Sequence, residues 1–194
     1  MTRKEQKEYR RMQILQVALH LFIHQGYYGT KTSQISREAK ISEGLLFHYF
    51  PTKESLLEEL VKMGAQGMQY PTKMSGCSPM DFFQEFTKQL FQYLGENPFI
   101  AELFVLMTQI LRTEGIPIRI RELAASVDAI AATEELIRAG QKEGSIRQGD
   151  SQALSNLYWC CIQGVVEQYA ARPEIPLPEP DWIVAMLKPD ISEE

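Results

Sequence analysis

The sequence predicts an all-α protein of about nine helices, on three observations. Apolar residues recur at helical spacing along nearly the whole chain, beginning with Ile14, Val17, Ala18, Leu21 and Phe22. No segment shows the strand–turn–strand alternation of a β-hairpin. The 194 residues are 44% apolar and 23% charged, a composition that suits a folded core and not a disordered chain.

The first three helices are predicted from their end signals. An amphipathic helix is expected to end at Gly26, in the left-handed conformation that glycine adopts most easily. A short helix follows over residues 31–39, with Thr30 as its N-cap. Another short helix is expected over residues 42–49, with Ser42 as its N-cap.

The rest of the chain is predicted to form longer helices separated by glycine and proline. Pro51 ends the third helix, and Thr52 caps the next. Residues 70–79 are expected to form a loop, and the four prolines of residues 173–180 an extended connector. Further helices are expected over residues 82–94, 99–111, 118–142, 151–170 and 182–187.

Charge is distributed unevenly along the chain. Residues 1–50 carry a net charge of +4, whereas residues 51–194 carry −9. A basic segment attached to an acidic one favours a polyanion as the partner of the basic segment. No apolar run reaches the length of a membrane span, so no membrane partner is expected, and a cytoplasmic location is predicted.

The two short helices each have too few apolar turns to be stable alone. They are therefore expected to pack on the first helix as a helix-turn-helix unit, whose second short helix enters the DNA major groove. In that helix, Leu46 and Tyr49 are expected to face the core and Phe47 and His48 to face outward. The small Gly44 lets the backbone approach DNA closely.

This segment resembles the DNA-binding domain of the TetR family of bacterial transcriptional regulators. The residues that match in order and spacing are Gly26, Thr30, Ile35, Ala39, Ser42, Gly44, Phe47, Tyr49, Phe50 and Lys53. The resemblance implies a DNA-binding domain over residues 1–50, with the family motif extending to about 65, and a helical effector-binding and dimerisation domain over residues 51–194. The DNA contacts it implies are Thr30, Lys31, Ser33, Ser42, Glu43, Gly44, Leu45, Phe47, His48 and Lys53.

Three positions depart from the family pattern. Phe47 stands where the family usually has a tyrosine that meets phosphate, and Lys40 stands at a turn position where glycine is common. Lys31 replaces a second threonine or serine. The DNA sequence that the family members read therefore cannot be transferred to this chain.

The predicted function is a dimeric DNA-binding transcriptional regulator, a repressor released from a pseudo-palindromic operator by a small apolar or amphipathic effector. The helices over residues 118–142 and 151–170 are expected to form the homodimer surface. Methionine and aromatic residues suggest an adaptable effector cavity, with a solid core as the alternative. The candidate effector-binding residues are Phe86, Glu102, Phe104, Met107 and Trp159.

Catalytic motifs are absent from the sequence, so no enzyme and no cofactor are predicted. The alternative is a helical carrier or enzyme that keeps a structural helix-turn-helix. His20 and His24 have metal-ligand spacing but no third ligand nearby in the sequence, so they are interpreted as surface histidines. Cys160 and Cys161 are interpreted as small core residues, with a thiol sensor as the alternative.

Overall fold

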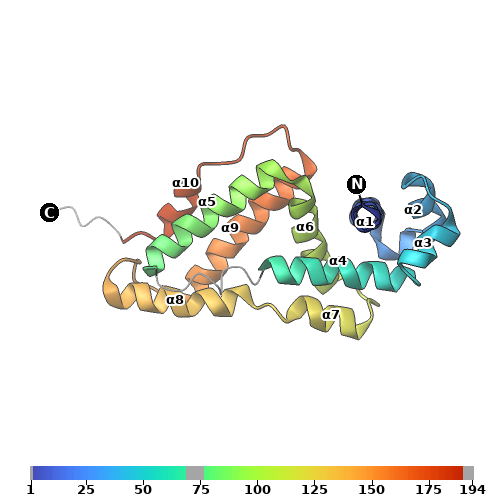
Figure 1. The fold of residues 1–194 in the computed structure, drawn as a ribbon. Helices are drawn as coiled ribbons and strands as arrows, with labels where there is room; N and C mark the ends of the chain where they lie inside the picture. The colour runs from blue at the N-terminus through green and yellow to red at the C-terminus, as the bar shows by residue number, and fades with distance from the viewer. Residues whose placement is uncertain (1, 69–76, 190–194) are drawn as a thin grey trace. The chain divides into compact units, whose positions relative to one another are not determined.

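The computed structural model describes residues 2–68 and 77–189, and Figure 1 draws its helices. Over these two ranges the regular structure is entirely helical, which confirms the predicted all-α class. None of the helices in these ranges is long and apolar enough to cross a membrane. Most of the predicted loop over residues 70–79 and the acidic tail from residue 190 lie outside the described residues.

The chain divides into two compact units, and each is built from separate stretches of sequence. The first unit comprises Met1–Ala65 and Glu102–Ala125. The second unit comprises Gln66–Ala101 and Ser126–Glu194. The helix α6 (Pro98–Arg112) contributes its first turn to the second unit and the remainder to the first.

Three helices of the first unit form the predicted helix-turn-helix arrangement. The long α1 (Arg3–Gly29) packs on α2 (Thr32–Glu38), and α2 packs on α3 (Glu43–Tyr49). The helix α2 buries Ile35, and α3 buries Leu46. The apolar stripe of α1 is fully buried through Ile14, Leu15, Ala18, Leu19, Leu21 and Phe22.

Of the end signals of these helices, the one at Ser42 is confirmed, whereas Gly26 and Thr30 do not act as predicted. The Ser42 hydroxyl accepts a hydrogen bond from the Leu45 N–H at 3.2 Å, as an N-cap does. Gly26 has φ +75° and kinks α1, although one more turn follows to Gly29. Thr30 does not cap α2. It lies at the C-cap of α1, and Lys31 is the N-cap of α2.

The turn between α2 and α3 contains a strained lysine. Lys40 adopts φ +54°, and it is the one non-glycine residue with positive φ in the described part of the chain. The left-handed region costs an ordinary side chain about 1–2 kcal/mol, because Cβ crowds the following carbonyl. The turn thus has a backbone geometry that suits glycine, and Lys40 adopts it at a cost in conformational energy.

The helix α4 (Lys53–Met68) follows and begins as predicted. The Thr52 hydroxyl accepts from the Ser55 N–H at 3.0 Å, and the Ser55 hydroxyl accepts from the Thr52 N–H at 3.2 Å. The buried face of α4 consists of Leu56, Leu57, Leu60, Val61 and Ala65.

Helix α6 lies against α4 at a point where α4 has no side chain. A Cβ atom added to Gly64 would lie 2.7 Å from the Cγ and Sδ atoms of Met107. Met107 is itself buried. A bare backbone at this position therefore lets the Met107 thioether pack directly on α4.

The second unit is centred on α9 (Ser151–Ala171), which packs on α8 (Ala129–Glu143). The short α10 (Pro180–Val184) contacts α9 and α5 (Pro79–Glu96), and Figure 1 shows these helices side by side. The core of the second unit is rich in aromatic rings.

The aromatic core of the second unit contains hydrogen bonds that satisfy its buried polar groups. The buried Tyr158 hydroxyl lies 2.8 Å from the Thr87 hydroxyl, and its ring meets Phe83 edge to face. The Trp159 indole N–H donates to the Thr133 hydroxyl at 2.9 Å. Burial raises the pKa of the Tyr158 hydroxyl above its ordinary value.

The helix predicted over residues 118–142 is two helices, α7 (Ile118–Ala125) and α8. The reason is Asp128, whose carboxylate accepts from the Ala131 N–H at 2.9 Å and so starts α8 anew. Residues 118–129 contain no glycine or proline, so only this N-cap marks the break. The last predicted helix, over residues 182–187, is α10 followed by a 3₁₀ turn at Ala185–Leu187.

We expect the Lys40→Gly variant to be more stable than the parent chain. Relief of left-handed strain outweighs the greater unfolded-state entropy of glycine, which leaves a gain of about 0.5–1 kcal/mol in the free energy of unfolding. Chemical denaturation measures this change. Lys40→Ala is the matched control, because it removes the charge and keeps Cβ. Equal stability of the two variants would show that strain is not the cause.

Candidate nucleic-acid interface

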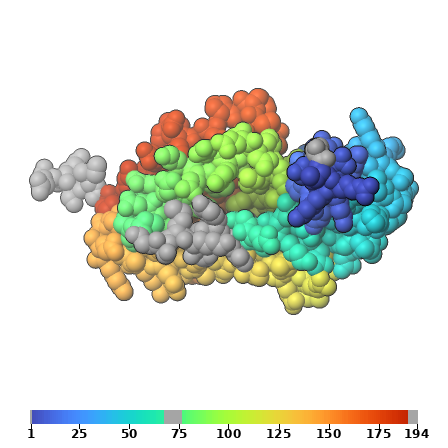
Figure 2. Space-filling view, viewed as in Figure 1, coloured from blue at the N-terminus to red at the C-terminus, as the bar shows by residue number. Residues whose placement is uncertain are grey.

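The outer face of α3 is uncovered. Leu45 and Phe47 keep 37% and 42% of their surface exposed, and His48 is exposed beside them. Leu46, by contrast, is fully buried. The predicted orientation is therefore confirmed for Leu46, Phe47 and His48, whereas Tyr49, also predicted to face the core, is only half-buried. The surface of residues 31–50, coloured light blue to cyan, lies open in the view of Figure 2.

Gly44 lies at the start of this face, and the fold does not require a glycine there. A Cβ atom added to Gly44 would meet no atom within 4 Å, and Gly44 is not among the glycines with positive φ. Its neighbours Ser42 and Glu43 are exposed as well. A glycine that neither packing nor backbone conformation demands leaves room for a close approach from outside the chain.

Thr30 is placed differently from the other predicted contacts. Its side chain is buried, with 1% of the residue exposed. The hydroxyl donates to the carbonyl oxygens of Gly26, at 2.9 Å, and Leu21, at 3.2 Å. These bonds hold the end of α1 after its kink. Thr30 therefore serves the fold, and we leave it out of the interface proposed below.

Basic side chains border the exposed face of α3. Lys31 and Ser33, which the family resemblance selects, are exposed at the start of α2. Arg37 and Lys40 are exposed too, at the end of α2 and in the turn. Neither Arg37 nor Lys40 is among the DNA contacts predicted from the sequence. Their positive charge was the only signal that could have found them.

Lys53 occupies a site inside the first unit instead of extending freely into solvent. Its ammonium donates to the carbonyl oxygens of Tyr27, at 2.8 Å, and Thr30, at 3.0 Å. It also lies 4.3 Å from the centre of the Tyr27 ring. Burial lowers the pKa of the Lys53 ammonium below its ordinary value. Lys53 thus ties the start of α4 to the junction of α1 and α2.

The candidate effector-binding residues fall in both units. Phe86 and Trp159 belong to the second unit, where their rings meet at 5.6 Å between centroids. The other three, Glu102, Phe104 and Met107, belong to the part of α6 in the first unit. Glu102 contacts His20 of α1.

The sequence of these helices matches the sequence model of a known protein family. The model of the bacterial regulatory proteins of the tetR family matches residues 14–60, from α1 into α4. The transcriptional regulator HbdR of Aromatoleum sp. (strain CIB) is 52% identical over 50 residues, which cover 26% of this chain and 22% of HbdR. RutR of Escherichia coli (strain K12) is 26% identical over 153 residues, 77% of this chain and 70% of RutR.

A solved structure extends the likeness beyond the helix-turn-helix. AibR, determined in complex with isovaleryl coenzyme A and operator DNA, matches with a TM-score of 0.71. The match covers 94% of this chain and all of AibR at 19% identity, which shows a shared fold. HbdR and RutR are both described as HTH-type transcriptional regulators. The match to the tetR family model therefore covers residues 14–60, and the likeness to AibR shows the fold of the chain.

Proposed function

We propose that this chain is a cytoplasmic transcriptional repressor that binds a pseudo-palindromic DNA operator through α3. The observation that carries the proposal is the uncovered face of α3, where Gly44, Leu45 and Phe47 are exposed together. A helix of this kind enters the major groove with its first residues against the base edges. Glu43 is placed to accept a hydrogen bond from a cytosine amino group.

Contacts to the DNA backbone are assigned to the cations around α3. Lys31, Arg37 and Lys40 are exposed and supply charge for phosphates. His48 is the candidate for the phosphate contact that Phe47 cannot make, because a phenyl ring has no hydroxyl. The ammonium of Lys53 has three N–H donors, of which two are used within the chain, so its third can meet a phosphate.

The proposed dimer surface is the outer face of α8 and α9. Leu157, Cys160 and Gly164 recur at helical spacing on α9 and are exposed. A Cβ atom added to Gly164 would meet nothing within 4 Å. Cys160 is therefore not the core residue we predicted. This face of α9 is apolar and carries small residues, so it can pack closely against the same face of a second copy of the chain.

An effector is proposed to control the dimer. AibR was solved with isovaleryl coenzyme A and operator DNA together, which supports a small molecule as the effector of a protein with this fold. An effector that binds better when α4 holds α3 out of register with the operator lowers DNA affinity by linkage. A compound library screened for a rise in melting temperature and a fall in operator affinity would identify it.

In vitro selection of bound duplexes from a random pool tests the proposed function. We expect two inverted half-sites whose centres lie about 34–36 Å apart, or a multiple of that distance. Affinity for the selected site is expected to fall steeply with salt, by about 0.9 log units per log unit of salt for each phosphate neutralised. A feeble, flat salt response with no selected sequence would favour the carrier or enzyme alternative.

We expect Gly44→Glu to weaken operator binding by at least about thirtyfold while the fold and the dimer persist. The space around residue 44 accepts a side chain in the free protein. At the DNA surface the same side chain adds bulk and a negative charge near phosphates. Fluorescence anisotropy with the selected duplex measures the loss. The control is Gly67→Glu, at an equally open position of α4, and equal affinities of the two variants would contradict α3 as the reading helix.

Lys53→Ala is expected to lower both stability and DNA affinity. Loss of the two carbonyl contacts costs about 1–3 kcal/mol in the free energy of unfolding. Affinity should fall by a similar factor for selected and random duplexes, because a phosphate contact reads no base. In the control Lys31→Ala, an exposed cation is lost, so affinity falls without a change in stability. A Lys53→Ala variant with altered base preference would refute the phosphate role.

The Leu157→Glu variant is expected to be a folded monomer. Leu157 is 48% exposed, so its substitution disturbs little inside one chain but buries a charge in the proposed dimer. Sedimentation velocity measures the mass, and circular dichroism checks the fold. Leu111→Glu is a matched control on α6, since Leu111 is also 48% exposed. If Leu157→Glu remains a dimer, this face of α9 is not the interface.

A further inference from the structure

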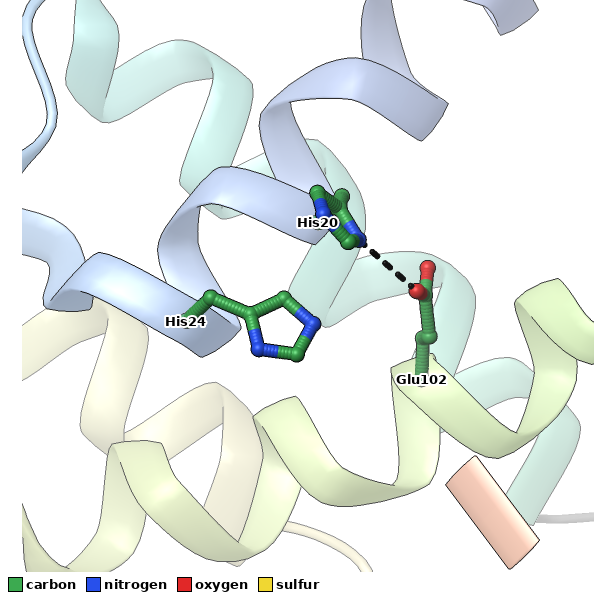
Figure 3. A group of neighbouring side chains, drawn as sticks. All are labelled: His20, His24 and Glu102. Carbon is green, nitrogen blue, oxygen red and sulfur yellow. Dashed lines mark hydrogen bonds and ion pairs between the residues drawn. The ribbon is translucent and has the colours of Figure 1, made fainter. Parts of the chain in front are cut away.

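Three side chains of the kinds that ligate metals meet at the surface of the first unit. His20 and His24 come from α1, and Glu102 comes from α6. Figure 3 shows Glu102 pointing toward His20, with the His24 ring beside them. No third ligand lies near the histidine pair in the sequence, so the pair was predicted to be two surface histidines. The fold supplies that ligand from 82 positions further along the chain.

The geometry of the two histidines follows from the helix. They are four residues apart and both precede the kink at Gly26, so they share one face of α1. Their ring centres lie 4.3 Å apart, with 56° between the ring planes. Both residues are exposed, which leaves the rings accessible to solvent. The pair thus presents two imidazole nitrogens on one side of the helix.

Glu102 completes the set. Its Oε1 atom lies 3.3 Å from Nδ1 of His20, and its side chain is one-quarter exposed. One ligand atom from each of the three residues lies within 4.8 Å of the other two. Two ligands that each lie about 2.1 Å from a tetrahedral zinc ion are about 3.4 Å apart. The His20–Glu102 pair already has this spacing, and the other pairs need closure of about 1.4 Å at most.

We propose that His20, His24 and Glu102 bind one divalent transition-metal ion of the zinc type, with solvent completing its coordination. Two imidazoles and one carboxylate form a donor set that zinc accepts, whereas calcium and magnesium prefer all-oxygen sites. A hydrogen-bonded pair of His20 and Glu102 accounts for two of the residues. It does not account for His24, whose ring lies against His20 with an accessible nitrogen.

A metal at this site would join α1 to α6 within the first unit. Helix α2 packs on α1, and α3 packs on α2. A bound ion would therefore restrain the support of the helix-turn-helix against a helix that starts 69 residues beyond Gly29 in the chain. Because the ion binds the folded arrangement and not the separated helices, it would also raise the melting temperature.

Titration of the full chain, without an affinity tag, with Zn²⁺ tests the proposal. Isothermal calorimetry gives stoichiometry and affinity, and Co²⁺ absorption in the visible range reports the ligand set. We expect one ion per chain and a melting temperature that rises by several degrees at saturation. The variants His20→Gln/His24→Gln and Glu102→Gln should each weaken binding by at least about tenfold, since even indirect metal partners are worth that much.

Two control variants locate the ion. His48→Gln removes the third histidine of the chain, which lies on α3, and should leave binding unchanged. The double variant Cys160→Ser/Cys161→Ser removes the adjacent thiols of α9 and should also leave it unchanged. Melting without metal checks that each variant is folded.

Three outcomes would overturn the metal site. They are no Zn²⁺ binding to the folded parent chain, undiminished binding to the His20→Gln/His24→Gln variant, and loss of binding in the cysteine variant. The site does not depend on the proposed function, since Zn²⁺ binding is measured without DNA.

Discussion

The helices α2 and α3 are seven residues long, so neither is stable without the other and without α1. Their apolar side chains, Ile35 and Leu46, are fully buried, and every outward residue of α3 depends on that burial for its orientation. The exposed face of α3 is thus a consequence of packing on the opposite side. The DNA recognition that we propose for this chain therefore depends on the same small core as the stability of the domain.

Lys53 adds a second constraint to this core. It places a positive charge under the junction of α1 and α2, held by two carbonyl oxygens and an aromatic ring. The partial loss of water around the ammonium is offset by these contacts. The residue that begins α4 therefore also binds the backbone at the end of α1, just before α2 begins. A single side chain can in this way connect the orientation of α4 to that of the helix-turn-helix.

The sequence was informative where a local signal decides the structure. Ser42 and Thr52 cap helices as their positions predict, and Lys40 takes the left-handed conformation that the family turn implies. It was misleading where two signals compete. Thr30 precedes a helix and ends another, and its hydroxyl is used by the earlier one. The break before α8 depends on Asp128 alone, within an otherwise continuous helical pattern.

The candidate sites also differ in how far local sequence signals predict them. The residues of α3 are adjacent in the sequence, so their helical spacing predicts which of them face outward. Glu102 and the histidines of α1 are brought together only by tertiary packing, which no spacing rule in the sequence reveals. The division of the candidate effector-binding residues between two compact units was unpredictable for the same reason.

The contact of Met107 with the bare backbone of Gly64 has a consequence for how the chain can change over time. Alanine at position 64 would overlap the thioether, whereas a shorter residue at position 107 would leave a void beside the glycine. Each change is harmful by itself, but the pair together conserves volume. The effects of substitutions at these two positions are therefore coupled. A substitution at one position is tolerated only together with a compensating substitution at the other.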